Sequence, residues 1–296
     1  MERSDPTRDP GKTNRTRAGP SRTAEGVAAF RAAESMLTED ERICYDPYAI
    51  RFTSPARLGG VAAHSEKSFP GLRNTIVARV RYFDDTVRAA ASDGLEQLVI
   101  MGAGYDTRAY RIDELKGCVR VFEIDRPDTQ QIKKEKIREI FSGLPDHVVY
   151  VAVDFETQEF GRRLLESGYS PVKKTLFVME GLIMYLPLPA IDAMLSFIVN
   201  SSGKGSAILF DCSGSSGSDA PSPTDARKNL GEHTARGGEP IRFAIPPEGV
   251  EAFLVQRGFS RVLTVTSEEY RRIYFHGKNK DRKLYGSLSF TYAVVG

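Results

Sequence analysis

A short glycine-containing segment, Gly102-Ala103-Gly104, is the first place in this sequence where the residue types suggest chemistry. It follows an apolar run and precedes a segment expected to be helical, and glycines in such a turn let the backbone approach a ligand closely. A dinucleotide-binding loop would have a third glycine three residues after the second, but Thr107 stands there. Asp106 would also lie where a pyrophosphate rests on a helix N-terminus, and its carboxylate would repel that anion. The loop therefore favours a ligand without phosphate groups.

An aspartate at the end of the next apolar run indicates what this ligand contains. Asp125 lies 21 residues after Gly104, and an acid at this spacing can accept hydrogen bonds from both hydroxyl groups of a ribose. Further carboxylates nearby would favour a cation. S-adenosylmethionine fits these requirements, because it carries a ribose, an adenine, a positively charged sulfonium and an amino-acid end but no phosphate. We therefore predict S-adenosylmethionine as the cofactor.

A parallel β-sheet would bring these residues together. Continuous apolar runs are typical of strands that are covered on both faces, and helical stretches between them predict parallel strands. Five such runs each close on a glycine or an acid: 98–106, 119–125, 148–154, 175–181 and 207–211. The carboxyl ends of parallel strands lie at one edge, where open α/β folds bind ligands. We expect five carboxylates to converge there: Asp106, Asp125, Asp154, Glu180 and Asp211. The alternative is that each acid only caps a helix or lies in a solvated turn.

The remaining segments predict how the chain is organised. Residues 1–22 contain no Val, Ile, Leu, Phe or Tyr, so they cannot form a core and should be a disordered tail. Residues 23–95 have apolar residues at helical spacing and predict a helical cap. Residues 96–296 would form the S-adenosylmethionine-binding catalytic core, with a flexible or substrate-side insertion around 213–247. The alternating pattern of the last strand, 287–294, suggests that it is antiparallel with one half-exposed face.

Composition excludes several classes of protein. The chain has 296 residues, with 41 Lys+Arg and 39 Asp+Glu, so it has no basic excess of the kind that nucleic-acid-binding proteins carry. Its three cysteines form no CxxC pair, which argues against a disulfide framework or a thiolate zinc site and fits a cytoplasmic location. The four histidines lack metal-site spacing, and no apolar run approaches the ~20 residues that span a bilayer. We expect no metal, nucleic acid or membrane partner, and the oligomeric state stays open.

Several segments together resemble the leucine carboxyl methyltransferase family, in its bacterial branch of S-adenosylmethionine-dependent methyltransferases. They occur in the order found in the family, and GAGYDTRAYR together with EGLIMYLP is the most specific pair. The matching segments are FRAAES (30–35), DPYA (46–49), ARVRYFDD (78–85), VIMGAGYDTRAYR (99–111), VFEIDRP (121–127), VDF (153–155) and MEGLIMYLP (179–187). The resemblance implies a class I methyltransferase fold: a Rossmann-like, mostly parallel seven-stranded α/β sheet with an antiparallel last strand and an N-terminal helical cap.

The resemblance also implies roles for individual residues. Arg79 matches the family arginine that pairs with the carboxylate of the cofactor's methionine, and a guanidinium can hold a carboxylate through two hydrogen bonds. Asp125 matches the ribose-binding acid, Asp154 and Phe155 match the pair that contacts the adenine, and Glu180 matches the acid near the methionine end. The predicted cofactor-binding residues are Arg79, Gly102, Ala103, Gly104, Asp125, Asp154, Phe155 and Glu180.

We predict that the protein is an O-methyltransferase that acts on a carboxylate or another oxygen nucleophile of a small molecule, the choice of oxygen resting on the resemblance. An ionised carboxylate needs no general base, so positioning would be the main contribution of the protein. A cation would have to hold this acceptor, and Arg73, Arg81 and Arg108 are candidates. Tyr185 could orient an acceptor oxygen. None is assigned as catalytic, because each could equally form a structural salt bridge or pack in the core.

Three alternatives stay open. Eukaryotic members of the family methylate a protein C-terminus, but they have a lysine just before the DPY segment where this chain has Tyr45. A nicotinamide-dependent oxidoreductase is disfavoured by Thr107 and Asp106. A non-catalytic module would bind the cofactor without transferring its methyl group.

Overall fold

The computed structural model describes residues 19, 21–155, 158–213, 231–236, 238–286 and 288–296. The predicted disordered tail (1–22) lies outside these residues except at positions 19, 21 and 22. Much of the predicted insertion, positions 214–230 and 237, also lies outside them. Helix α1 (Arg22–Ser35) begins where it does because the Ser21 side chain accepts a hydrogen bond from the Ala24 backbone and caps it. The proposed limits of tail, cap and core stay predictions.

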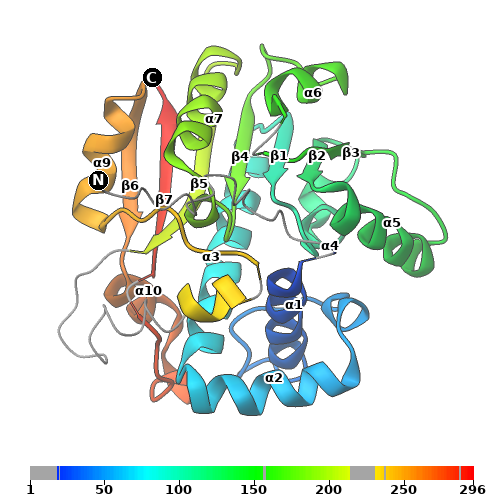
Figure 1. Cartoon of the computed structure of the whole chain (residues 1–296), viewed down its shortest axis with the longest axis vertical. Coiled ribbons are helices and arrows are strands. Elements are labelled where there is room, and N and C mark those ends of the chain that lie inside the picture. The colour runs from blue at the N-terminus through cyan, green and yellow to red at the C-terminus, as the bar shows by residue number, and fades with distance from the viewer. Residues whose placement is uncertain (1–18, 20, 156–157, 214–230, 237, 287) are drawn as a thin grey trace, which may run out of the picture.

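The described residues contain one mixed sheet of seven strands with the order β3-β2-β1-β4-β5-β7-β6 (Figure 1). The first five strands in this order run parallel to one another, and β7 runs antiparallel to both β5 and β6. This confirms the predicted mostly parallel sheet with an antiparallel last strand. The strands are β1 (Gln97–Met101), β2 (Arg120–Asp125), β3 (Val148–Ala152), β4 (Thr175–Met179), β5 (Ala207–Ser213), β6 (Phe259–Val265) and β7 (Leu288–Val295).

Helices cover both faces of the sheet and form a cap at one end. The α-helices after α1 are α2 (Pro55–Ser68), α3 (Leu72–Ser92), α4 (Arg108–Arg111), α5 (Pro127–Phe141), α6 (Phe160–Glu166), α7 (Leu188–Asn200), α9 (Pro247–Val255) and α10 (Ser267–Tyr274). Short 3-10 helices are η1 (Ala49–Phe52), η2 (Asp113–Leu115), η3 (Ile183–Tyr185) and η4 (Gly277–Asn279). Figure 1 shows α1 and α2 together at the lower end of the molecule, with α6 and α7 toward the upper end.

The core divides into two layers because successive side chains of a strand point to opposite faces. Leu98 and Ile100 of β1 pack into one layer with residues of α3, α5 and α10. Val99 and Met101 pack into the other layer with residues of α6, α7 and α9. Every residue of β1 is therefore buried, which is why the apolar run at this strand is continuous rather than alternating.

Helix α3 connects the cap to the sheet. Its apolar residues recur at helical spacing and are buried along one face, as the sequence predicts: Ile76, Val80, Phe83 and Val87. Phe83 meets Phe290 of β7 at 6.1 Å between ring centroids. The C-terminal half of α3 therefore packs on the sheet, and its N-terminal half is left to face the end of the molecule where α1 and α2 lie.

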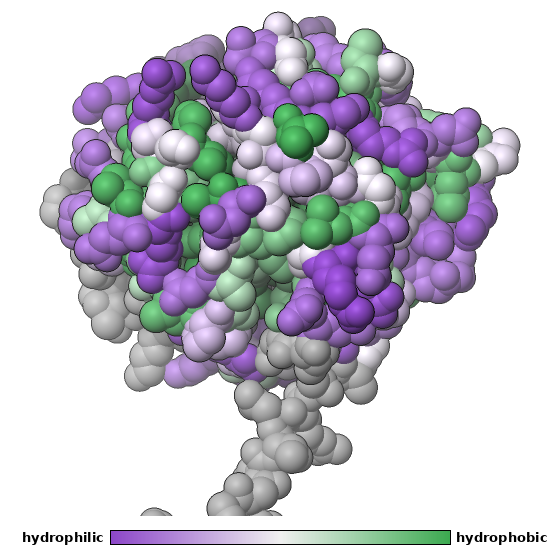
Figure 2. Space-filling model, turned by 90° about the horizontal axis from the view of Figure 1, so that it is seen from above, coloured by the Kyte–Doolittle hydropathy of each residue, from purple (hydrophilic) through white to green (hydrophobic). Residues whose placement is uncertain are grey.

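The opposite end of the molecule is predominantly polar. Figure 2 shows this end from above, with hydrophilic residues over most of the face and hydrophobic residues in small groups between them. In the described part of the chain, no helix is both long and apolar enough to cross a membrane.

Candidate functional site

A cavity of about 1090 Å³ lies at the carboxyl ends of the parallel strands. Strand β1 pairs with β2 on one side and β4 on the other, so successive connections leave the sheet in opposite directions at this point, which is the usual ligand site of an open α/β sheet. Residues of α1, α2, α3 and the segment 238–242 also line the cavity. All eight predicted cofactor-binding residues line it: Arg79, Gly102, Ala103, Gly104, Asp125, Asp154, Phe155 and Glu180.

The glycine loop is tied to the end of β2. The Gly104 backbone N–H donates to Oδ2 of Asp125, and Oδ1 of Asp125 accepts from the Arg126 backbone at 2.6 Å. Gly104 has a φ of +43°, and a Cβ at this position would lie 3.1 Å from Cβ of Ala24 in α1. A side chain here would therefore be strained and would also press on α1.

The residues after β3 lie beside Asp125. Arg126 Nη1 is 3.4 Å from Oδ2 of Asp154, and the Asp154 backbone donates to Oε1 of Gln158 at 3.0 Å. Phe155 is half-buried, packs against the core layer under α6 and lines the cavity. This end of the cavity thus combines two carboxylates with an aromatic ring.

The other end of the cavity is organised by Arg79 of α3, which is buried. Its Nε lies 3.0 Å from Oε1 of Glu180, and its Nη1 lies 2.9 Å from Oδ2 of Asp211. Burial alone would lower the pKa of Arg79, but the carboxylates of Asp211 and Glu180 outweigh that effect and raise it. Asp211 was expected at the end of a strand; it lies instead within β5, where it is fully buried.

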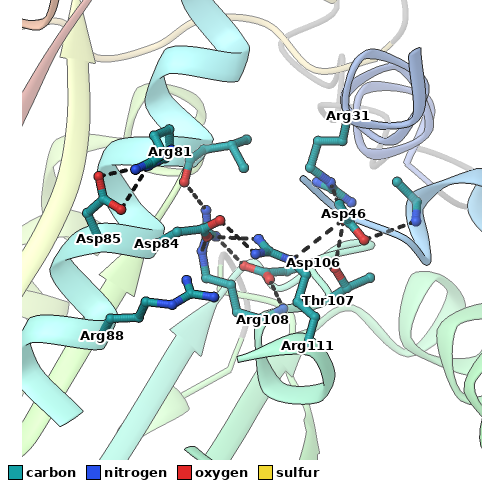
Figure 3. Close-up of polar contacts among 12 residues, drawn as sticks. Arg31, Asp46, Arg81, Asp84, Asp85, Arg88, Asp106, Thr107, Arg108 and Arg111 are labelled. Carbon is teal, nitrogen blue, oxygen red and sulfur yellow. Dashed lines mark hydrogen bonds and ion pairs between the residues drawn. The ribbon is translucent and has the colours of Figure 1, made fainter. Parts of the chain in front are cut away.

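Arg108 joins the glycine loop to the cap. Its Nε is 2.7 Å from Oδ1 of Asp84 on α3, and its Nη1 is 2.6 Å from both Oδ2 of Asp106 and Oε2 of Glu180. Figure 3 shows Asp84 pointing toward Arg108 and Arg111. Burial acts to raise the pKa of Asp106, but Arg108 and the neighbouring cations lower it. Asp106 is therefore an ionised carboxylate paired with Arg108, which it shares with Asp84 and Glu180. The sequence argument about a pyrophosphate did not include this cation.

A second part of this network reaches α1. Arg31 Nε is 2.9 Å from Oδ2 of Asp46, which also accepts from Thr107 Oγ1 at 2.7 Å. Arg111 donates to both oxygens of Asp84, at 2.6 and 2.8 Å (Figure 3). Sequence reasoning did not predict roles for Asp46, Asp84 or Arg111. One signal was available for Asp84. It lies four residues after Val80 and directly after Phe83, so it is a charged residue on the apolar face of a helix.

The five strand-end acids thus form two groups, one around Arg79 and Arg108 and the other beside Arg126. Asp106, Glu180 and Asp211 surround Arg79 and Arg108, whereas Asp125 and Asp154 lie beside Arg126. Four of the five line the cavity, as expected, and Asp211 does not. Most of them are paired with arginine side chains rather than exposed as isolated negative charges.

The candidate acceptor-binding residues have structural partners. Arg73 Nη2 lies 2.8 Å from Oε2 of Glu34, and Arg81 Nε lies 2.9 Å from Oδ1 of Asp85. Tyr185 lines the cavity, and burial raises the pKa of its hydroxyl, which is therefore neutral at pH 7 and able to donate a hydrogen bond. Within the described residues, no group of three or more His, Cys, Asp or Glu side chains is arranged to hold a metal ion.

A buried ion pair supports the glycine loop from the side of α5. Lys133 Nζ is 2.8 Å from Oε2 of Glu123 and 3.4 Å from the carbonyl oxygen of Ala103. Tyr110 donates to the same Glu123 oxygen at 3.1 Å. Burial raises the pKa of Glu123 to about 7, even though Lys133 acts to lower it.

We expect this glutamate to make the free energy of unfolding depend on pH. The folded-state pKa of about 7 is above the ordinary value of 4.5, so the folded protein binds more protons at this group. The contribution of Glu123 to the free energy of unfolding, up to about 3 kcal/mol, is fully present below pH 4.5 and is lost as the pH rises through 7. Urea unfolding of Glu123→Gln from pH 5 to 8 should show a smaller decline with pH than the parent protein. The exposed Glu135→Gln on α5 is the control, and an equal decline in all three proteins would contradict the raised pKa.

Comparisons with known proteins are consistent with this geometry. The family model for leucine carboxyl methyltransferase matches residues 24–199. A protein of Mycolicibacterium smegmatis named "putative S-adenosyl-L-methionine-dependent methyltransferase" is 34% identical over 196 residues, which are 63% of this chain and 64% of that protein. The protein YktD of Bacillus subtilis, named in the same way, is 26% identical over 223 residues, 75% of this chain and 73% of that protein. The match thus spans less than two thirds of the length of the first relative.

Two solved structures share the fold. A protein of Thermobifida fusca described as a "putative methyltransferase" has a TM-score of 0.65 at 14% identity, over 94% of this chain and 95% of that chain. A protein of the DUF574 family from Streptomyces avermitilis has a TM-score of 0.63 at 12% identity, over 94% and 98% of the two chains. With the strand order above, these similarities support the class I methyltransferase fold that the sequence predicted.

Proposed function

Because this chain belongs to the leucine carboxyl methyltransferase family, we propose that it is an S-adenosylmethionine-dependent methyltransferase that methylates an oxygen of a small molecule, with a carboxylate as the preferred acceptor. One observation carries the cofactor part of this proposal: all eight residues predicted to bind the cofactor line one cavity at the carboxyl edge of the sheet. The relatives named above, whose names include the same cofactor, support it.

The residue types in the cavity fit the parts of this cofactor. Each carboxylate oxygen has two lone pairs, so Asp125 can hold Gly104 and Arg126 and still accept from the two ribose hydroxyls. Phe155 offers a ring for the adenine, and Asp154 an acceptor for the adenine amino group. Arg79 would hold the methionine carboxylate, and Glu180 its ammonium group. The volume exceeds the ~300–1,000 Å³ typical of a pocket for one small ligand, so a small acceptor can share it.

An apolar surface is available for that acceptor. Leu72 and Ile76 lie one turn apart on the face of α3 that continues from Arg79, and both line the cavity together with Phe69 and Tyr285. The rings of Phe69 and Tyr285 meet edge to face at 5.8 Å. We therefore propose an acceptor with an apolar body that packs along this half of α3.

Methyl transfer to a carboxylate requires little chemistry from the residues of this chain. S-adenosylmethionine supplies the activated methyl group and a positive sulfonium that itself attracts an acceptor carboxylate. No proton has to be removed, so the residues of this chain need only align the acceptor and exclude water, and such positioning can supply several kcal/mol. The neutral hydroxyl of Tyr185 is available to donate a hydrogen bond to an acceptor oxygen. The buried thiols of Cys44 and Cys212 suit the cytoplasmic location that we also propose.

The experiment that tests the proposal combines binding with methyl transfer. S-adenosylhomocysteine should bind the protein with an affinity in the micromolar range, measured by calorimetry. With labelled S-adenosylmethionine, the label should enter base-labile esters of apolar carboxylic acids and should not enter the matched amides. Absence of heat on titration, or protection from thermal unfolding by NAD but not by S-adenosylmethionine, would contradict the proposal. Binding without turnover on any acceptor would instead favour a non-catalytic module.

A further inference from the structure

A fully buried carboxylate lies in the interior of β5, in the otherwise apolar sequence AILFD. Asp211 accepts from the Gly181 backbone N–H at 2.5 Å through Oδ1, and its Oδ2 is 2.9 Å from Nη1 of Arg79. Its side chain has no exposed surface, and it is not among the residues that line the cavity. Burying a charge in a strand is costly unless it is paired and hydrogen-bonded. Asp211 therefore has a specific pairing but no direct access to a ligand.

The two acids beside Arg79 leave one part of its guanidinium for a ligand. Glu180 accepts from Nε and Asp211 accepts from Nη1, whereas Nη2 donates no hydrogen bond to the described residues. Arg79 lines the cavity, so this remaining nitrogen is the part that a bound carboxylate can use. A guanidinium is planar and rigid, and holding two of its nitrogens therefore sets the direction of the third.

Gly181 completes this arrangement from the other side. It has a φ of +62°, and a Cβ at this position would lie 3.3 Å from Nη1 and 3.5 Å from Nη2 of Arg79. The backbone turn after β4 therefore packs closely against the guanidinium, and Asp211 binds the N–H of the same glycine. One carboxylate thus holds both the arginine and the turn beside it.

We propose that Asp211 is a positioning residue that aims Nη2 of Arg79 at the carboxylate of the cofactor's methionine end. This inference rests on the proposed function and adds a residue that does not touch the cofactor. It predicts that Asp211 affects the binding affinity only of ligands that carry the amino-acid end, because the ribose and adenine contacts lie on the other side of the cavity, around Asp125.

Two ligands and one isosteric variant test this role. S-adenosylhomocysteine carries the methionine-type carboxylate, whereas 5′-methylthioadenosine has the same nucleoside and sulfur but no amino-acid end. In Asp211→Asn, calorimetry should show S-adenosylhomocysteine binding weakened by about 10-fold, which corresponds to one misplaced charge-assisted hydrogen bond. Binding of 5′-methylthioadenosine should stay within about 2-fold of the parent value, because none of its groups meets Arg79.

Cys212→Ala is the matched control, since Cys212 is the next residue of β5, is also buried, and has its Sγ 3.2 Å from Oγ of Ser289. It should bind both ligands like the parent protein. Equal weakening of both ligands in Asp211→Asn, or no weakening of either, would overturn the positioning role while leaving the proposed function intact. If the parent protein binds neither ligand, the proposed function itself fails and the inference falls with it.

A crystal structure of the parent protein with S-adenosylhomocysteine decides the matter if Asp211→Asn does not fold or if 5′-methylthioadenosine binds too weakly to measure. Arg79 should keep its contacts to Asp211 and Glu180 and present Nη2 to the ligand carboxylate. An arginine that leaves Asp211 in order to reach the ligand would overturn the inference.

Discussion

Replacing Asp125 by alanine should weaken S-adenosylhomocysteine binding at least about 100-fold, because two charge-assisted hydrogen bonds to the ribose are lost at about 1.5–3 kcal/mol each. The same change removes the acceptor for the Gly104 backbone N–H, so the glycine loop would also lose the group that holds it. Isothermal titration calorimetry measures the effect directly. Asp125→Asn should be affected less, because its amide keeps one oxygen that can accept.

The control for this prediction is Asp128→Ala, three residues further along the chain. Asp128 lies in the first turn of α5, and its Oδ1 accepts from the Thr129 backbone at 2.8 Å. It does not line the cavity, so its removal should leave the affinity within about 2-fold. A folded Asp125→Ala protein that still binds S-adenosylhomocysteine as well as the control would refute the assignment of this aspartate to the ribose.

Replacing Arg108 by methionine should lower the free energy of unfolding by about 3–5 kcal/mol, the usual cost of leaving buried charges without their partner. Three carboxylates, each at most 10% exposed, would lose their contact with Arg108: Asp84, Asp106 and Glu180. Asp84 would keep Arg111 and Glu180 would keep Arg79, so the loss would be greatest at Asp106. Urea unfolding followed by circular dichroism at pH 7 measures the loss.

The difference in free energy of unfolding between Arg108→Met and the parent protein should become smaller at lower pH. In the parent protein Arg108 and other cations hold the pKa of Asp106 below its ordinary value. The ionised Asp106 therefore stabilises the folded protein above an unfolded-state pKa of about 3.9, and this stabilisation is lost as the pH falls below that value. Without Arg108 the buried carboxylates would take up protons at a higher pH, which relieves their repulsion. The variant should therefore approach the parent protein in stability near pH 4.

Arg81→Met provides the comparison for a salt bridge of the same type at the surface. Arg81 and Asp85 are 47% and 42% exposed, and exposed pairs contribute at most about 1 kcal/mol. If Arg108→Met costs no more than Arg81→Met, the buried network does not hold the cap to the glycine loop, and that interpretation must be abandoned.

Much of the fold could be predicted from the chain because its signals are local. A run such as Leu98–Met101 is apolar throughout because both faces of its strand are covered, and the alternation in the last strand marked it as different from the others. The position of Asp125 relative to Gly104 is likewise a matter of spacing along one strand–helix–strand unit. All eight predicted residues line one cavity, and their roles toward the cofactor stay predictions.

The charges of the site could not be predicted in this way. Arg79 and Arg108 are ordinary helical residues in the sequence, and nothing near them shows that each is buried between carboxylates. Their partners come from elsewhere: Asp211 is 132 residues from Arg79, and Asp84 is 24 residues from Arg108. Even Arg108, only two residues from Asp106, was not predicted to pair with it, because two residues close in sequence pair only if the turn between them brings their side chains together.

The amino-acid sequence by itself thus indicated the five parallel strands, the helices between them and the edge where a ligand would bind, because hydrophobic periodicity and turn residues act over a few neighbouring positions. The tertiary structure alone decided which charges face the cavity, which are paired, and which nitrogens of Arg79 donate to Glu180 and Asp211. Ion pairs between distant segments form only when packing removes both partners from water, and no short stretch of sequence records that event.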